Sequence, residues 1–210
     1  MNKNLKPICL GFAAVLMSAS LLRAEEAQEM TIGGGITIAN DSLKKVTHNS
    51  LGLNFNVSTQ MPIASSNVKF RPGLGLNILP GKWGENNDID NGLVTESKTQ
   101  LINIQATFDV LVPLPVPGID HLALVTGLSI NNWRYSGQTK DGNPHPFGLQ
   151  GSAAPADIKV GLRVGVDYRI NKQWSSELLL QVVEFGSRNT EVHYHNFNPS
   201  WLQLGVGYHF

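Results

Sequence analysis

The chain has 210 residues, of which 15% are charged, and its 16 basic residues equal its 16 acidic ones. About a quarter of the residues of a soluble globular domain are usually charged, so this composition is unusually poor in charge. The balance leaves no basic excess for nucleic acid, which excludes that class of partner. The length fits one domain with room for a removable leader.

Residues 1–24 predict a secretory signal peptide. Two lysines precede the apolar stretch ICLGFAAVLMSASLL, and cleavage is expected after Ala24. About 15 apolar residues are too few for a helix that must cross a bilayer. The only cysteine, Cys9, lies in this leader, so the mature chain 25–210 has no disulfide and retains 13 basic and 16 acidic residues.

From residue 30 onward, apolar and polar residues alternate with the period of two that is typical of β-strands. In 158–170 (IKVGLRVGVDYRI), every apolar residue falls on one face, with glycine and charged residues on the other. The pattern predicts eight strands: 30–39, 51–59, 68–78, 98–112, 121–135, 158–170, 174–185 and 201–210.

The connections between these strands alternate in length. Long polar connections cover 40–50, 79–97, 136–157 and 186–200, and short ones cover 60–67, 113–120 and 171–173. Long loops on one rim, short turns on the other and an even strand number are typical of outer-membrane barrels. We therefore predict an all-β fold for 25–210: an eight-stranded antiparallel transmembrane β-barrel with up-and-down meander order, in the bacterial outer membrane.

Glycine indicates which face of the barrel points inward. Glycines share the polar face of several strands, as in 68–78 and 158–170, and the interior of an eight-stranded barrel has room only for filling side chains. The bulky apolar face is therefore expected to face lipid. The alternative is a soluble lipocalin-type carrier with its apolar face inside. One proline, Pro72, falls inside a strand, where we expect a β-bulge.

Aromatic residues gather on the apolar face near the short turns. They predict a girdle at the periplasmic membrane interface, formed by Phe70, Phe108, Tyr168, Trp174, Tyr208 and Phe210.

Two stretches resemble a known family. The C-terminal WLQLGVGYHF resembles the signal that the barrel-assembly machinery recognises in bacterial outer-membrane proteins, through Leu202, Leu204, Val206, Tyr208 and Phe210. The stretch YRINKQWSSELLLQ (168–181) is similar to the turn between two late strands of OmpA-type, OmpX-type and opacity-protein barrels. The resemblance implies a barrel domain only, without the peptidoglycan-binding domain of the full OmpA plan. It also implies a monomer whose partners are outer-membrane lipid, lipopolysaccharide and the assembly machinery.

Charged residues on the inward phase predict an ionic network in the lumen. It would comprise Lys69, Arg71, Asp109, Lys159, Arg163, Asp167, Arg169 and Glu177. A symmetric turn at 171–173 would place Asp167 opposite Glu177, and like charges there repel, so an arginine must come between them. We expect the network to plug the barrel, with structural filling as the alternative.

No catalytic, metal or cofactor site is predicted. The segment FGSRN (185–189) lacks the histidine of a lipid A deacylase motif, and His193 and His195 lack a third metal ligand. The acidic tract 84–92 lacks the glycine and glutamate spacing of a calcium loop.

The favoured function is a structural or surface-interaction role, with binding through the long loops. Candidate loop contacts for an extracellular ligand are Trp83, Trp133 and Phe147. The alternatives are a narrow channel for small solutes and, less favoured, a lipid A-modifying enzyme.

Overall fold

The structure is a computed structural model of the chain, and it describes residues 29–63, 66–87, 94–140, 157–183 and 200–210. The predicted signal peptide, the FGSRN segment, His193, His195 and Phe147 lie outside the described residues. The described elements are β1 (Glu29–Ala39), α2 (Asp41–Thr47), β2 (Leu51–Pro62), β3 (Lys69–Leu79), β4 (Gly84–Asn87), β5 (Val94–Pro113), β6 (Leu122–Thr139), β7 (Asp157–Arg169), β8 (Trp174–Val183) and β9 (Ser200–His209).

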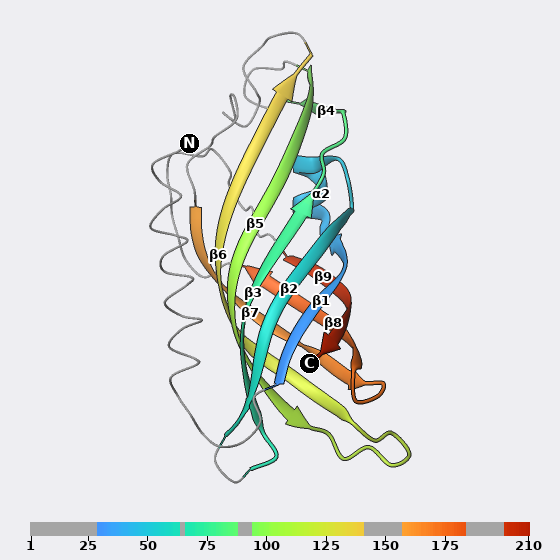
Figure 1. Cartoon of the computed structure of the whole chain (residues 1–210). Coiled ribbons are helices and arrows are strands. Elements are labelled where there is room, and N and C mark those ends of the chain that lie inside the picture. Colours follow the sequence, from blue (N-terminus) through green and yellow to red (C-terminus); the bar gives the residue numbers. More distant parts are fainter. Residues whose placement is uncertain (1–28, 64–65, 88–93, 141–156, 184–199) are drawn as a thin grey trace.

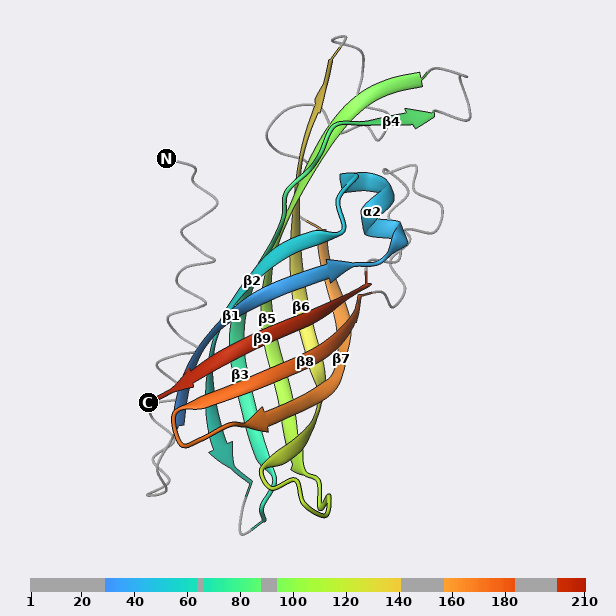
Figure 2. The same cartoon turned by 90° about the vertical axis from the view of Figure 1, so that its right-hand side faces the viewer.

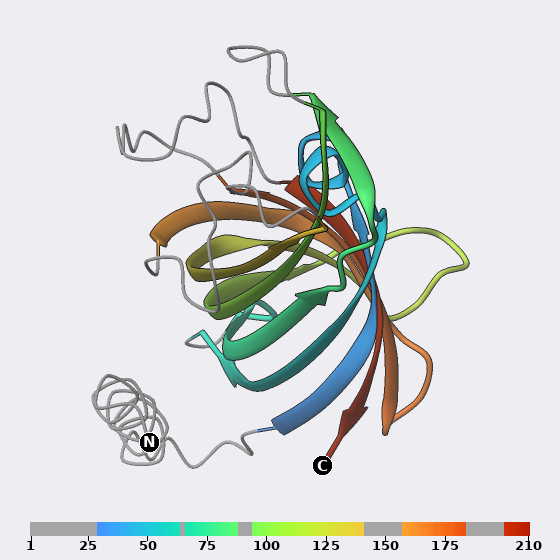
Figure 3. The same ribbon diagram turned by 90° about the horizontal axis from the view of Figure 1, so that it is seen from above.

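Antiparallel pairing of neighbouring strands closes the sheet into a barrel (Figures 1 and 3). The first strand, β1, pairs with the last, β9, and β3 pairs directly with β5. The short β4 pairs with β5 beyond the end of β3, so it prolongs that side of the wall and adds no new position around the ring. The predicted eight-stranded meander barrel is therefore confirmed.

The apolar side chains point outward, as the glycine pattern predicts. On β7, Ile158 is 65% exposed, whereas Arg163 on the opposite phase is 6% exposed. Contiguous apolar surface of this extent is unfavourable in water, whereas a closed barrel satisfies its backbone hydrogen bonds in lipid. A soluble carrier with an apolar interior has the opposite arrangement. Within the described part of the chain, no helix is long and apolar enough to cross a membrane.

Two glycines allow neighbouring strands to approach closely. A Cβ atom added at Gly35 would lie 1.9 Å from the carbonyl oxygen of Leu204, and one at Gly165 would lie 2.0 Å from that of Leu178. Both contacts are with backbone, which cannot move aside without breaking the ladder. Any larger residue at these positions would therefore push two strands apart.

The expected bulge at Pro72 is wrong. The β2–β3 register is the same on both sides of it, with Ser58 opposite Gly73 and Met61 opposite Phe70, so no extra residue is inserted. Proline has no N–H for the ladder, and the strand accommodates it by omitting the rungs between these two pairs.

The strands β5 and β6 extend further than the alternation predicts. They have 20 and 18 residues, and they pair with each other from Pro113 to Ser97. Pairing of β6 with β7 reaches only to Trp133. Above that level β4, β5 and β6 form a three-stranded extension of the barrel wall at the long-loop end (Figures 1 and 2).

The predicted polar loop 40–50 contains the helix α2. The side-chain oxygen of Asn40 accepts a hydrogen bond from the Leu43 amide at 3.1 Å, and His48 ends the helix in the left-handed conformation. Leu43 and Val46 are buried, so the helix turns an apolar side toward the barrel mouth.

Candidate functional site

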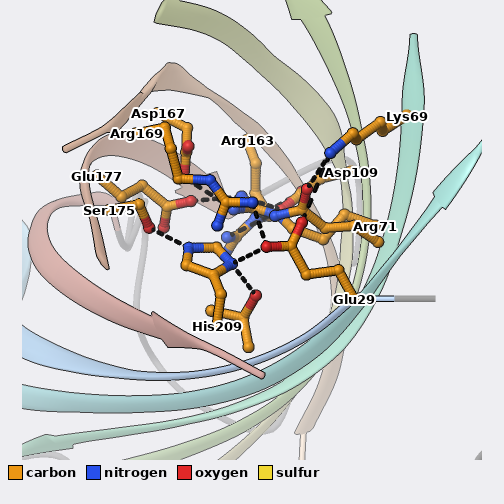
Figure 4. Close-up of polar contacts among 12 residues, drawn as sticks. Glu29, Lys69, Arg71, Asp109, Arg163, Asp167, Arg169, Ser175, Glu177 and His209 are labelled. Carbon is orange, nitrogen blue, oxygen red and sulfur yellow. Dashed lines mark hydrogen bonds and ion pairs between the residues drawn. The ribbon is translucent and has the colours of Figure 1, made fainter. Parts of the chain in front are cut away.

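Arg71 is the centre of an ionic network inside the barrel (Figure 4). Its Nη2 lies 3.0 Å from the Oδ2 of Asp109, its Nη1 lies 3.4 Å from the Oδ2 of Asp167, and it also contacts Glu177. The residue is 6% exposed. A buried charge needs such pairing, because desolvation is otherwise very costly.

A second arginine shares the same carboxylate. The Nε of Arg163 donates a hydrogen bond to Asp109 Oδ1 at 2.9 Å, and its Nη2 donates one to Asp109 Oδ2 at 3.3 Å. The two residues therefore form a bidentate salt bridge. Its Nη1 donates to Gln181 Oε1 at 3.0 Å. Asp109, which is 1% exposed, thus joins the two guanidinium groups.

The strand register explains why these groups converge. Asp167 lies opposite Glu177 across the turn between β7 and β8, as the sequence predicts, and Arg71 lies opposite Asp109 on β5. The two carboxylates at the first pair would repel each other. Arg71 reaches across the lumen and contacts both of them.

A second cluster lies nearer the short-turn end and includes two residues that the sequence analysis did not assign to the network. Glu29 contacts Arg169, and its other oxygen lies 3.6 Å from the Lys69 Nζ. His209 Nδ1 lies 3.2 Å from Glu29 and 2.9 Å from the Thr31 hydroxyl. Glu29 was missed because it precedes the first predicted strand, although it shares the inward phase of the odd-numbered residues of β1.

Ser175, His209 and Glu29 lie next to one another in that order. The Ser175 hydroxyl lies 2.8 Å from His209 Nε2, and Glu29 is on the other side of the ring. This order matches a serine, base and carboxylate triad, but Ser175 is 3% and His209 4% exposed, so the hydroxyl is closed off from an incoming substrate. These contacts of His209 join β1, β8 and β9 where the barrel closes, and we call them the clasp.

Replacing His209 by alanine is expected to lower the free energy of unfolding by about 1–3 kcal/mol, because it leaves the buried Ser175 and Thr31 hydroxyls without this partner. The temperature at which the folded band is lost in a heat-modifiability gel measures the effect. Ser175→Ala, which removes a single hydrogen bond at the same place, should cost less. An unchanged temperature for His209→Ala would exclude the clasp.

Lys159 lies at a different level of the lumen from Arg71 and Arg163. It is opposite Asn131 in the β6–β7 register, four residues along β7 from Arg163. This level holds buried amides: Asn103 Nδ2 donates to Asn131 Oδ1 at 3.0 Å, and Gln181 Nε2 donates to the same oxygen at 2.9 Å. The lumen charges that the sequence grouped together are therefore spread over more than one depth.

An apolar plug fills the lumen at the long-loop end. We define it by its buried members, Ala39, Leu43, Leu79, Leu101, Trp133, Val183 and Trp201. The rings of Trp133 and Trp201 meet edge to face with centroids 5.3 Å apart. Leu43 comes from α2, so the helix contributes a side chain to the plug.

Trp133 is therefore not a surface loop contact. It lies in β6 on the inward phase and is 0% exposed. Trp83, by contrast, is 42% exposed between β3 and β4, and the Lys140 Nζ lies 5.6 Å from its ring centroid.

The predicted girdle residues lie on the outer surface at the short-turn end. Trp174 and Tyr208 meet edge to face with ring centroids 5.0 Å apart, as do Tyr208 and Phe210. In β9, Leu204 and Val206 are exposed on the same outward phase, while Gln203 and His209 point into the lumen.

Side chains thus fill the lumen at two levels, the apolar plug and the ionic network. Between them lies a cavity of about 20 Å³, bordered by Asn54, Gln105 and Arg163 among others. That volume holds about one water molecule. Among the described residues, no cluster of histidine, cysteine, aspartate or glutamate is arranged to hold a metal ion.

Comparison with known proteins agrees with this architecture. No curated protein sequence matches the chain. Similar solved structures include a major outer membrane protein from Thermus thermophilus (15% identity, TM-score 0.53, 88% of this chain and 100% of that chain). Others are Neisserial surface protein A (16%, 0.49, 87% and 97%) and OprG from Pseudomonas aeruginosa (10%, 0.47, 88% and 97%).

At these identities the likeness concerns the fold alone. The family model described as the outer membrane protein beta-barrel domain matches residues 10–210. The chain therefore belongs to the outer-membrane β-barrel protein family, and its place is the bacterial outer membrane.

Proposed function

We propose that the protein is a closed membrane scaffold that presents its β4–β5–β6 extension at the cell surface for structural or adhesive contacts. The proposal rests on the combination of a lumen filled by side chains at two levels with a wall in which β5 and β6 continue beyond the β6–β7 pairs. Long loops of such barrels are extracellular and short turns periplasmic. The extension is therefore extracellular, and the ionic network is nearer the periplasm.

Trp83 is the part of the extension best suited to a surface contact. It combines a large exposed ring with a neighbouring cation, Lys140, and aromatic side chains are enriched at the energetic centres of interfaces. The partner would be an extracellular ligand or a neighbouring envelope component. On the periplasmic side, the alternating β9 strand would be the segment that the barrel-assembly machinery engages, and the folded barrel would be a monomer in lipid and lipopolysaccharide.

A narrow channel for small solutes is the second candidate. It would need both the apolar plug and the ionic network to open, since eight strands leave a lumen that side chains fill. A lipid A-modifying activity has less support, because the triad-like Ser175 is enclosed.

Purified protein in planar bilayers is expected to produce no conductance steps above those of protein-free bilayers. A parallel labelling experiment tests the surface presentation: the mature chain is cysteine-free if cleavage follows Ala24, so Trp83→Cys provides one thiol. A membrane-impermeant maleimide should label it on intact cells and leave Ser175→Cys unlabelled.

The two measurements separate the candidates. Regular conductance steps from folded, heat-modifiable protein would favour the channel over the scaffold. Absence of Trp83→Cys labelling on intact cells, with labelling restored after the outer membrane is opened, would contradict the surface location of the extension.

A further inference from the structure

A large cavity lies at the periplasmic mouth of the barrel, apart from the extracellular extension. Its volume is about 770 Å³, and it lies among the short-turn ends of β3, β5, β6 and β7. We call it the vestibule. Its volume falls within the range of about 300–1,000 Å³ that is typical of small-molecule sites.

Part of the vestibule lining is apolar. Leu111, Pro113, Leu114, Leu122 and Ala123 border it. Leu111 also belongs to a buried apolar cluster inside the lumen, together with Val125 and Leu179. An apolar chain that entered the vestibule would therefore contact buried apolar side chains at the inner end of the vestibule.

The charged side chains of the lining carry an excess of positive charge. Lys69, Arg169 and Lys172 border the vestibule with a single carboxylate, Asp167. That carboxylate is already held by Arg71, whose Nη1 lies 3.4 Å away. Glu29 pairs with Lys69 and Arg169 from within the barrel (Figure 4), but it is not among the residues that border the vestibule.

The two lysines are the more accessible of these cations. The Lys69 side chain is 43% exposed and Lys172 lies in the exposed turn between β7 and β8, whereas the Arg169 side chain is 21% exposed. Flexible ammonium groups at the rim of a partly apolar cavity attract anions and form charge-assisted hydrogen bonds with phosphate or carboxylate oxygens.

We propose that the vestibule binds an amphiphilic anion, with its phosphate or carboxylate head against Lys69, Arg169 and Lys172 and its apolar tail against Leu111 and Leu114. A phospholipid of the inner leaflet and a free fatty acid share this chemistry. Such a periplasmic site goes beyond the proposed surface role and does not depend on it.

The test uses the full mature protein in phosphatidylcholine nanodiscs, titrated with hexyl phosphate in a calorimeter and corrected for empty discs. Hexyl phosphate is expected to bind at least about tenfold more tightly than inorganic phosphate, because its tail buries apolar surface. Hexanol, which lacks the charge, should show no saturable binding. Lys69→Gln with Lys172→Gln should weaken binding of hexyl phosphate about fivefold to tenfold.

The matched control removes two lysines at the other end of the barrel, Lys45→Gln with Lys82→Gln, and should leave the affinity unchanged. Equal affinity of wild type and the Lys69/Lys172 variant would overturn the proposal, as would hexanol binding as tightly as hexyl phosphate or no saturable binding of either hexyl phosphate or hexanoate.

Two further arms identify the source of the anion. Including phosphatidylglycerol in the discs should weaken binding of hexyl phosphate by competition if lipid head groups occupy the vestibule. Tighter binding of hexanoate than of hexyl phosphate, with no effect of phosphatidylglycerol, would support a free fatty acid.

Discussion

Replacing Arg71 by methionine is expected to lower the free energy of unfolding by about 3–5 kcal/mol. The substitution keeps much of the volume but removes the cation that contacts Asp109, Asp167 and Glu177. Arg163 would still pair with Asp109, but the Asp167 and Glu177 carboxylates, which face each other in the register, would lose the cation between them. Urea unfolding in lipid vesicles, followed by tryptophan fluorescence, measures the loss.

Two comparisons make this result specific. Arg134→Met removes an arginine from the outward phase of β6, opposite Ile102, and should change the unfolding midpoint little. Neutralising the facing pair in the Arg71→Met background, with Asp167→Asn and Glu177→Gln, should recover most of the lost stability, since the cost arises from uncompensated charge. A similar midpoint for Arg71→Met and wild type would show that the network contributes no net stability.

The sequence predicted the barrel because strand geometry repeats every two residues. An alternation such as that in 158–170 therefore fixes both the strand and its two faces at once. The short turn at 171–173 also fixed a register, which is why the opposition of Asp167 and Glu177 could be predicted.

Contacts across the lumen could not be predicted in the same way. Arg71 on β3 and Glu177 on β8 are not on neighbouring strands, and their meeting depends on how far each strand is staggered around the closed ring. Lys159 shares the inward phase with Arg163 but lies at another depth, four residues earlier in β7. Glu29 and His209 join the network only because closure pairs β1 with β9.

The apolar plug was missed for a different reason. The seven-residue helix α2 is too short for a clear helical period, and its apolar residue Leu43 is buried only because the barrel mouth lies beneath it. Trp133 was predicted to be a loop contact because it lies close to the end of the predicted strand 121–135, whereas β6 continues to Thr139 and holds this residue on the inward phase. A large aromatic residue on an otherwise polar inward phase, as also at Trp201, is the signal that could have indicated a plug.

Replacing Trp201 by alanine is expected to cost about 3–5 kcal/mol of stability, the range for truncating a large buried aromatic side chain. Trp201 is 1% exposed, and its ring packs edge to face against Trp133 with centroids 5.3 Å apart. The matched control is Trp174→Ala, at a ring that is 43% exposed on the outer surface. There lipid can fill the space left by the ring, so the loss of stability should be smaller.

Conductance distinguishes the plug from the ionic network as barriers. Trp201→Ala alone should stay closed, because the network around Arg71 still fills the lumen nearer the periplasm. Trp201→Ala combined with Arg71→Ala, Asp167→Asn and Glu177→Gln removes large side chains from both levels and should allow small ions to pass. Conductance in Trp201→Ala alone would mean that the apolar plug is the only effective barrier, whereas equal stability losses for Trp201→Ala and Trp174→Ala would contradict the packing of the plug itself.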